Sequence, residues 1–222
     1  MAERGDLPRR LLTVAVPRCV ACLYGKATLR AWRTKAPVNQ FRVPPATAPG
    51  SVVAVDQLVS STPGLIGQMK GFLTRRRYVV TTVFVDHFSG LSYVHSQMST
   101  DASSTIEVKR AFERYAKSHG VTVHHNHADN GMFSSKAFMD EISKRGQTIT
   151  FCAVNAHHQN SRAEKRIRDL QESAHTMLLH ARQRWPEAIT ANLWPFAIYR
   201  LYYGRQTDPQ RHPDVPNQHA ER

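Results

Sequence analysis

Short runs of apolar and β-branched residues, separated by turn residues, predict buried strands in the first half of the chain. The run SVVAVDQLV at residues 51–59 is almost continuously apolar, which is typical of a strand buried on both faces. Two further runs occupy residues 77–88 and 91–97, and Ser89-Gly90 between them indicates a hairpin turn. The first three strands are therefore expected to be antiparallel neighbours.

Helical periodicity dominates the second half of the chain. In residues 103–120 apolar side chains recur at helical spacing, with Ser103 or Ser104 as a candidate cap and Gly120 as the stop. The later elements are expected, in chain order, to be a strand at 121–129, a helix at 134–146, a strand at 147–154 and a long amphipathic helix at about 159–184. This order of strands and helices predicts a mixed α/β protein.

Proline positions indicate where this α/β domain begins and ends. No proline lies between residues 64 and 185, whereas prolines crowd the segments before and after it. We therefore divide the chain into a basic N-terminal segment at 1–35, a Pro-rich linker at 36–50, a domain at 51–205 and a flexible tail at 206–222. The 222 residues, 41% of them hydrophobic, are enough for one medium domain with a buried core.

The charge balance indicates a polyanionic partner. The formal net charge is +13 and the isoelectric point is near 10.2, which favours binding to nucleic acid or to an anionic membrane surface. Nine basic residues against two acidic ones make residues 1–50 a basic arm. No apolar run approaches the roughly 20 residues of a membrane-spanning helix, and three cysteines do not make a disulfide framework. The sequence thus predicts a soluble, intracellular protein.

Three acidic residues occupy positions at which the predicted elements can bring them together. Asp56 is in the first strand, Asp129 ends the fourth, and Glu164 begins the long helix. Mg²⁺ prefers hard oxygen ligands, and two such ions about 3.5 to 4 Å apart activate an attacking hydroxyl and stabilise a leaving oxygen. Each residue also has an ordinary interpretation: a strand-end ion pair for Asp56, a turn for Asp129, and a capping box with Ser161 for Glu164. A buried carboxylate inside VVAVDQL is costly without a cation, which favours the metal interpretation.

The residues around these carboxylates resemble a known family. VDQL in the first strand, HADNG at the end of the fourth and NAHHQNSRAEKR at the helix start are similar to the D, D, E motif of retroviral-type integrase cores, most closely those of copia-type retrotransposons. The resemblance covers roughly residues 47–205. It implies a ribonuclease H-like fold, with Asp56, Asp129 and Glu164 as ligands of two Mg²⁺ or Mn²⁺ ions. The 34 residues between Asp129 and Glu164 are close to the family's spacing, whereas Ser161 stands where the family commonly has Gly.

The activity of that family gives the expected function. Its members trim the ends of a linear element DNA and join the 3′ hydroxyls to target DNA. The resemblance therefore implies double-stranded DNA as the partner, a homo-oligomer as the active form, and the nucleus as the place of action. Two rival interpretations stay open: a DNA-binding protein that has kept the fold and lost catalysis, and a metal-dependent nuclease on the same fold.

Basic residues near the carboxylates are candidate phosphate contacts. They are Arg162, Lys165, Arg166 and Arg168 at the start of the long helix, Arg75, Arg76 and Arg77 before the second strand, and, by the resemblance, Asn160. Phosphate contacts position a duplex and carry little sequence information, so binding is expected to be salt-dependent and weakly specific. An ordinary charged helix face and a solvent-exposed hairpin are the alternatives.

A cysteine pair near the N-terminus has the spacing of half a zinc site, Cys19-x-x-Cys22. CVACLYGKATLRAW at 19–32 resembles the last half of the zinc-binding module that precedes integrase cores, which adds Zn²⁺ as an implied metal. No histidine precedes His87, so the family's upstream histidine pair is missing. Either the chain is a fragment of a longer polyprotein, or the pair no longer binds zinc. Cys152, in an apolar run, is expected to be an inert core residue.

Three other polar residues are assigned structural roles. His125 and His127 alternate onto one face of the fourth strand and are expected to be polar packing rather than metal ligands. Asp86 immediately precedes the predicted hairpin turn, which favours a turn role over a fourth catalytic acid.

Overall fold

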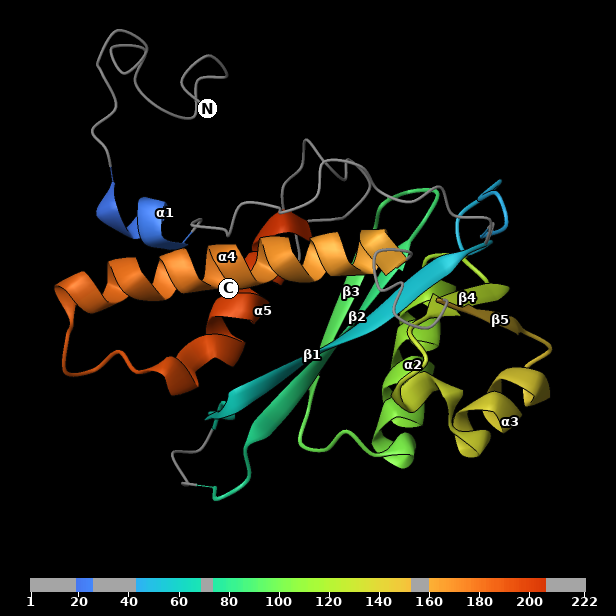
Figure 1. The fold of residues 1–222 in the computed structure, drawn as a ribbon, viewed down its shortest axis with the longest axis horizontal. Coiled ribbons are helices and arrows are strands. Elements are labelled where there is room, and N and C mark those ends of the chain that lie inside the picture. Colours follow the sequence, from blue (N-terminus) through green and yellow to red (C-terminus); the bar gives the residue numbers. More distant parts are fainter. Residues whose placement is uncertain (1–18, 26–42, 69–73, 153–159, 207–222) are drawn as a thin grey trace, which may run out of the picture.

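A five-stranded sheet forms the centre of the computed structural model, which describes residues 19–25, 43–68, 74–152 and 160–206 (Figure 1). The strands are β1 (Val53–Gly64), β2 (Tyr78–Asp86), β3 (Ser92–Gln97), β4 (His125–Ala128) and β5 (Thr148–Phe151). Their order across the sheet is β3-β2-β1-β4-β5. β2 is antiparallel to both β1 and β3, whereas β1, β4 and β5 run parallel.

Helices cover both faces of this sheet (Figure 1). The sheet-covering helices are α2 (Ala102–Ser118), α3 (Lys136–Lys144), α4 (Ser161–Arg184) and α5 (Trp194–Gln206), and the short helix α1 (Val20–Gly25) packs on α4. Two 3₁₀ turns are η3 (Met132–Ser134) and η5 (Ala191–Leu193). One face packs against α2 and α3, and the other against α4 and α5. The predicted ribonuclease H-like arrangement, a mixed five-stranded sheet flanked by helices, is confirmed.

Alternation along β1 builds two hydrophobic cores, one on each side of the sheet. Val53 and Val55 are fully buried in the core formed with α2 and α3. In that core Phe84 stacks on Phe112 with 4.4 Å between ring centroids. Ala54, between the two valines, belongs to the core under α4 and α5. Burying one valine side chain is worth about 1.5 kcal/mol or more, so β1 anchors both layers, as its nearly continuous apolar run predicted.

The β2–β3 turn has the structure expected from Ser89-Gly90. Asp86 Oδ2 accepts a hydrogen bond from the Ser89 amide at 2.7 Å, and its Oδ1 accepts one from the Gly50 amide at 2.9 Å. Gly90 has φ +71°, a value that glycine adopts without steric cost. The turn role predicted for Asp86 is confirmed.

Two local predictions were wrong. The N-cap of α2 is Asp101 rather than Ser103 or Ser104, because the Asp101 carboxylate accepts from the Ser104 amide at 3.2 Å. The fourth strand has only four residues and begins at His125. The residue before it is bonded to the end of the linker instead, since the His124 amide donates to the Gly50 carbonyl at 2.9 Å.

An ionic network joins α2 to α3. Glu141, which is 6% exposed, accepts hydrogen bonds from Arg110 Nε at 2.9 Å and from Arg145 Nε at 2.9 Å. The hydrogen bonds from Arg110 are the main reason that the pKa of Glu141 falls to about 2, and Arg145 adds to the effect. Lys109, 1% exposed, pairs with Glu113 in the same network. These charges are buried at tolerable cost because each has an opposite charge beside it.

The proposed divisions of the chain extend beyond the described residues. Residues 1–18, 26–42, 69–73, 153–159 and 207–222 lie outside them, so the division into N-terminal segment, linker, domain and tail stays a prediction. Within the described part, no helix combines the length and the apolar character needed to cross a bilayer.

Candidate active site

Strand register brings two of the predicted carboxylates side by side. Val55 pairs with Ala128 across β1 and β4, and Ala128 pairs with Phe151 across β4 and β5. The ladder continues past β5, since the Cys152 amide donates to the Ala128 carbonyl at 3.0 Å. The next residue on each of these parallel strands belongs to one row, which we call the strand-end row: Asp56, Asp129 and Cys152.

The strand-end row lies on the side of the sheet that α4 covers. Residues two apart on a strand share a face, so Asp56 shares the face of Ala54, which packs with Ala163 of α4 in one core. Ala128 belongs to the opposite core, under α2 and α3, so the next residue, Asp129, is on the α4 face as well. Both aspartates are partly exposed at this edge of the core.

The start of α4 is fixed to β1 directly beside Asp56. Asn160, the N-cap residue, is 2% exposed, and its side-chain amide donates to the Val55 carbonyl at 2.9 Å. The N-cap is Asn160 rather than Ser161, and its side chain makes no capping bond, so the Ser161–Glu164 capping box does not form. Glu164 therefore stands in the first turn of α4, over the strand-end row.

The pKa of the Cys152 thiol is affected by all three carboxylates. Burial is the largest cause that raises the pKa of Cys152, to about 11, and the negative charges of Asp129, Glu164 and Asp56 follow as further causes. Coulombic effects fall with distance, so all three carboxylates lie within electrostatic range of this one sulfur. The inert core role expected for Cys152 fits its 2% exposure and neutral thiol. Its place in the row beside both aspartates was not foreseen.

Backbone amides orient both aspartates of the row. Asp56 Oδ1 accepts from the amide of Gln57 at 2.8 Å, and Asp129 Oδ1 accepts from the amide of Asn130 at 2.6 Å. The Asn130 side chain in turn donates to the Cys152 carbonyl at 2.8 Å, which holds the loop after β4 against the end of β5. Hydrogen bonds of this kind fix carboxylate orientation on rigid elements, as a metal site requires.

The chemistry of this donor set suits a hard cation. It consists of three carboxylates, and oxygen ligands of this kind suit Mg²⁺ or Mn²⁺ better than Zn²⁺. Among the described residues, the group with all its ligand atoms within 4.8 Å of one another is Cys19, Cys22 and His180. The three carboxylates are therefore more widely spaced than the ligands of a single ion. Two ions about 3.5 to 4 Å apart need a wider spread of ligands than one ion does.

The predicted phosphate contacts around α4 fall into two kinds. Arg162 donates to the His87 carbonyl, and Arg166 Nε donates to Ser92 Oγ at 2.9 Å, so both tie α4 to the β2–β3 side. Lys165 and Arg168 are exposed beside Glu164. Arg168 follows Glu164 by four residues and so shares its face of the helix. Asn160 is buried and holds α4 to β1, which keeps its side chain from the surface.

The predicted arginine patch before β2 lies at the other end of the sheet. Tyr78 pairs with Gly64, whereas Val83 pairs with Asp56. Five residues of β2 span the interval between these two pairs, which is about 17 Å at the rise of a strand, because β1 is irregular between Val59 and Gly64. Arg75 and Arg76 are exposed there, and Arg77 donates to the Thr74 carbonyl at 2.5 Å. The structure therefore does not bring Arg75, Arg76 and Arg77 to the strand-end row.

The histidines near the row are held by hydrogen bonds within the sheet. Both ring nitrogens of His125 contact threonine hydroxyls of β5, at 2.7 and 2.9 Å, and His127 Nδ1 lies 2.9 Å from Thr150 Oγ1. The predicted packing role of His125 and His127 is confirmed. Burial, and then the charge of Arg162, lowers the pKa of His87 to about 4, so this ring is neutral at neutral pH.

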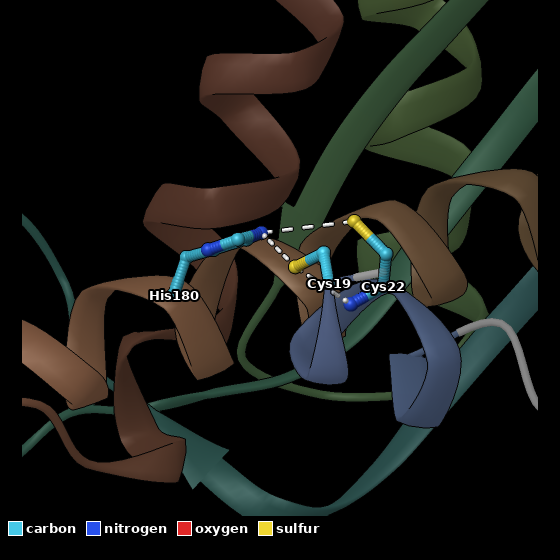
Figure 2. A group of neighbouring side chains, drawn as sticks. All are labelled: Cys19, Cys22 and His180. Carbon is cyan, nitrogen blue, oxygen red and sulfur yellow. Dashed lines mark hydrogen bonds between the residues drawn. The ribbon is translucent and has the colours of Figure 1, made fainter. Parts of the chain in front are cut away.

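The cysteine pair is not part of this site. Cys19 and Cys22 lie at α1, which packs on α4, and they face His180 near the other end of that helix (Figure 2). From the sequence alone, Cys19 and Cys22 were interpreted as half of a zinc site whose histidine pair is missing. The structure supplies a third donor, which sequence reasoning missed because His180 is 158 residues beyond Cys22 on an exposed helix face.

Comparison with known proteins gives structural neighbours but no sequence relatives. No protein-family model and no curated protein matches the chain. A simian T-cell lymphotropic virus intasome in complex with PP2A regulatory subunit B56 gamma is similar with a TM-score of 0.47 and 17% identity, over 68% of this chain and 48% of that chain. The magnesium-bound, dimeric HTLV-2 integrase catalytic core domain gives 0.45 and 19%, over 71% and 89%. The BIV integrase catalytic core domain gives 0.42 and 20%, over 68% and 83%.

The first of these neighbours is a viral intasome, and the other two are integrase catalytic core domains. The chain spans about half the length of the intasome chain that it matches. All three TM-scores lie below 0.5 and all identities below 25%, so the function of this chain rests on its own residues.

Proposed function

We propose that this chain is the catalytic core of a retrotransposon-type integrase. In this proposal it binds the ends of a linear element DNA, trims them, and joins their 3′ hydroxyls to target DNA in a metal-dependent reaction. The observation that carries the proposal is the strand register that puts Asp56 and Asp129 at neighbouring strand ends, on the face covered by α4, which has Glu164 in its first turn. The D, D, E motif resemblance in the sequence supports the same assignment.

Each residue has a defined part in the proposed reaction. Asp56 and Asp129 would hold the cations from the strand-end row, and Glu164 would complete the ligand set from α4. When bound, two Mg²⁺ or Mn²⁺ ions supply a lowered pKa for the attacking hydroxyl and charge neutralisation at the phosphate. Exposed Lys165 and Arg168 hold DNA phosphates beside the carboxylates.

The partners and the setting follow from that reaction. Its substrates are duplex element ends and duplex target DNA, and joining two ends in concert requires at least two copies of the chain, so we propose a homo-oligomer as the active form. Because the target is chromosomal DNA, the nucleus is the proposed place of action. The formal net charge of +13 suits a polyanionic substrate.

A second candidate function is a DNA-binding protein that has lost catalysis. It is favoured by Ser161, which stands where the resembling family commonly has Gly. The two candidates therefore differ in one measurable property: whether adding Mg²⁺ or Mn²⁺ produces joined DNA.

Asp129→Asn tests the proposal. The substitution keeps the shape of the side chain and removes its charge. We expect metal-dependent joining of a labelled DNA end to a supercoiled target to fall by about 1,000-fold or more, because a metal-ligand contact is worth several kcal/mol in the transition state. DNA binding should persist or improve, since a negative charge is removed near the phosphates. Asp140→Asn, at an exposed acid on α3, is the matched control and should join normally.

The products separate the remaining alternatives. Cleaved ends without joined products would identify a nuclease on the same fold. An Asp129→Asn variant that joins at the rate of the unaltered chain would remove Asp129 from the site. DNA binding with no metal-dependent product from the unaltered chain would leave the catalytically inactive alternative.

A further inference from the structure

Two cysteines and one histidine from opposite ends of the described chain converge on the outer side of α4. Cys19 Sγ lies 3.3 Å from His180 Nε2, and Cys22 Sγ lies 3.7 Å from the same nitrogen (Figure 2). The three ligand atoms all lie within 4.8 Å of one another. Because the thiols point at one ring nitrogen rather than into a core, the arrangement needs an explanation beyond packing.

The spacing of these atoms matches the edges of a zinc tetrahedron. With Zn–S near 2.3 Å and Zn–N near 2.0 to 2.1 Å, a tetrahedral sulfur and nitrogen lie about 3.6 Å apart. The two measured S···N distances, 3.3 and 3.7 Å, lie on either side of that value. The Cys22 amide also donates to Cys19 Sγ at 3.4 Å, so the backbone stabilises a negative sulfur at this position.

Packing of α1 on α4 holds the cysteines in place. Ala21, between the two cysteines, is 2% exposed. Gly25 lies so close to α4 that a Cβ there would be 2.1 Å from Thr176 Oγ1 and 3.0 Å from Thr176 Cα. Thr176 is one turn before His180 and therefore on the same face of α4. The close approach of the two helices and the convergence of the ligands are thus separate observations that agree.

We propose that Cys19, Cys22 and His180 bind one zinc-class cation, with water or another donor in the fourth position. Two thiolates and one imidazole form a soft donor set that selects Zn²⁺ over Mg²⁺. Binding releases the thiol protons to solvent and gives a site with no net charge. The site differs from the arrangement implied by the integrase resemblance, in which the partners of the cysteines are an upstream histidine pair. Here the partner is a histidine of the helix that carries Glu164.

The proposed cation would act as a staple between the N-terminal segment and the domain. His180 follows Glu164 by sixteen residues, about 24 Å along α4, so the site is remote from the strand-end row and takes no part in its chemistry. Its effect would be to hold α1 on α4. Because Zn²⁺ binding energy becomes folding energy where the site exists only in the folded chain, removing the cation should release α1 first.

Cobalt(II) and zinc titrations of the reduced, full-length chain test this proposal. We expect one Zn²⁺ per chain by mass spectrometry, and with Co²⁺ a thiolate-to-cobalt charge-transfer absorption that carboxylate-bound Co²⁺ does not give. His180→Ala should weaken Zn²⁺ binding by more than about 100-fold, beyond the 10- to 100-fold typical of losing a supporting contact. His175→Ala, at another exposed histidine of α4, is the matched control and should bind as the unaltered chain does.

Three results would overturn the proposal. The reduced chain takes up no Zn²⁺ and gives no sulfur–cobalt band. The His180→Ala variant binds Zn²⁺ as tightly as the His175→Ala control, which would leave the cysteine pair without the histidine. Mass spectrometry of the chain prepared under reducing conditions finds Cys19 and Cys22 as a disulfide. None of these readouts depends on DNA joining, so failure here and failure of the integrase proposal are distinguishable.

Discussion

The strand-end row and the Cys19–Cys22–His180 group occupy the two ends of α4, and they are built on different principles. At the row, rigid parallel strands set the positions, and register alone places Asp56 beside Asp129. At the other end, a six-residue helix and one face of α4 meet through side-chain packing. The row offers hard oxygen ligands, and the second group offers two sulfurs and a nitrogen.

The first site therefore depends on the sheet, and the second depends on the docking of α1 on α4. A ligand on a central strand is held by the whole fold, so its position persists with or without a cation. A ligand on α1 is held by a small contact, so its position depends on whatever else joins α1 to α4. We therefore expect that a substitution at one site leaves the other site unchanged.

The largest effect is expected from Glu164→Gln. Removing this charge should lower metal-dependent joining by about 1,000-fold or more, for the same reason as at Asp129. Zn²⁺ uptake at His180 should not change, because about 24 Å of helix separates the two positions. Joining assays and zinc stoichiometry on one preparation measure both. A loss of Zn²⁺ in this variant would show that the two ends of α4 are coupled, which would contradict the independence of the two sites.

The reverse separation is expected from Gly25→Ala. A Cβ at Gly25 would meet Thr176 Oγ1 at 2.1 Å, so α1 must shift on α4 and carry its cysteines away from His180. We expect Zn²⁺ affinity to fall by about 10-fold or more, since misplacing a ligand costs at least as much as losing a supporting contact. Joining should be unchanged.

Gly67→Ala is the matched glycine control. Its Cβ would make an ordinary contact, 3.4 Å from Phe196 Cε1. Equal Zn²⁺ affinity in the two glycine variants would contradict the role assigned to the α1–α4 packing.

A moderate effect is expected from neutralising one exposed cation beside the row. Lys165→Ala should weaken DNA binding several-fold and reduce by about one the slope of log affinity against log salt. Arg76→Ala removes an equally exposed charge that lies before β2, at the other end of the sheet. Binding of short DNA ends, titrated at several salt concentrations, compares the two. If Arg76→Ala has the larger effect, the DNA path runs along the far end of the sheet.

The smallest effect on either site is expected from Glu141→Gln, which weakens the α2–α3 network. Losing a charged hydrogen-bond acceptor costs about 2 kcal/mol, or about 4 to 8 °C in Tm for a chain of this size. Because the folded pKa of Glu141 is lowered to about 2, from about 4.3 when unfolded, the carboxylate stabilises the fold above pH 4.3.

That contribution disappears as the pH falls from about 4.3 to about 2. The difference in Tm between Glu141→Gln and the unaltered chain should therefore shrink over this interval in calorimetry. Zn²⁺ affinity and joining at neutral pH should be unchanged. A change in either would mean that global stability, rather than local ligands, controls the two sites.

The strand order was predictable because it depends on local patterns. The apolar run of β1 and the turn at Gly90 are visible in the sequence, and they fix the first three strands. The cap of α2 was misplaced because Asp101 precedes two serines that are equally good caps in isolation. Only the hydrogen bond to the Ser104 amide decides between them.

The candidate sites were predictable to different degrees, because only some of their residues belong to a local sequence pattern. Asp56 and Asp129 each end or interrupt an apolar run, so each can be recognised in the sequence as a candidate site residue. Their proximity depends on the register of β1 and β4, which the sequence does not show. Cys152 joins the row only through the pairing of β5 with β4, which no local pattern specifies. His180 carries no signal at all, since an exposed histidine on a long polar helix is ordinary until α1 is placed against it.

Mechanically, α4 is a stiff rod of 24 residues, about 36 Å long, with α1 seated across it toward its C-terminal part (Figure 1). A force applied to the N-terminus acts first on the contact between α1 and α4, before it acts on the strands. Under single-molecule tension, α1 should therefore peel away in a first, low-force event, and the sheet should shear only later.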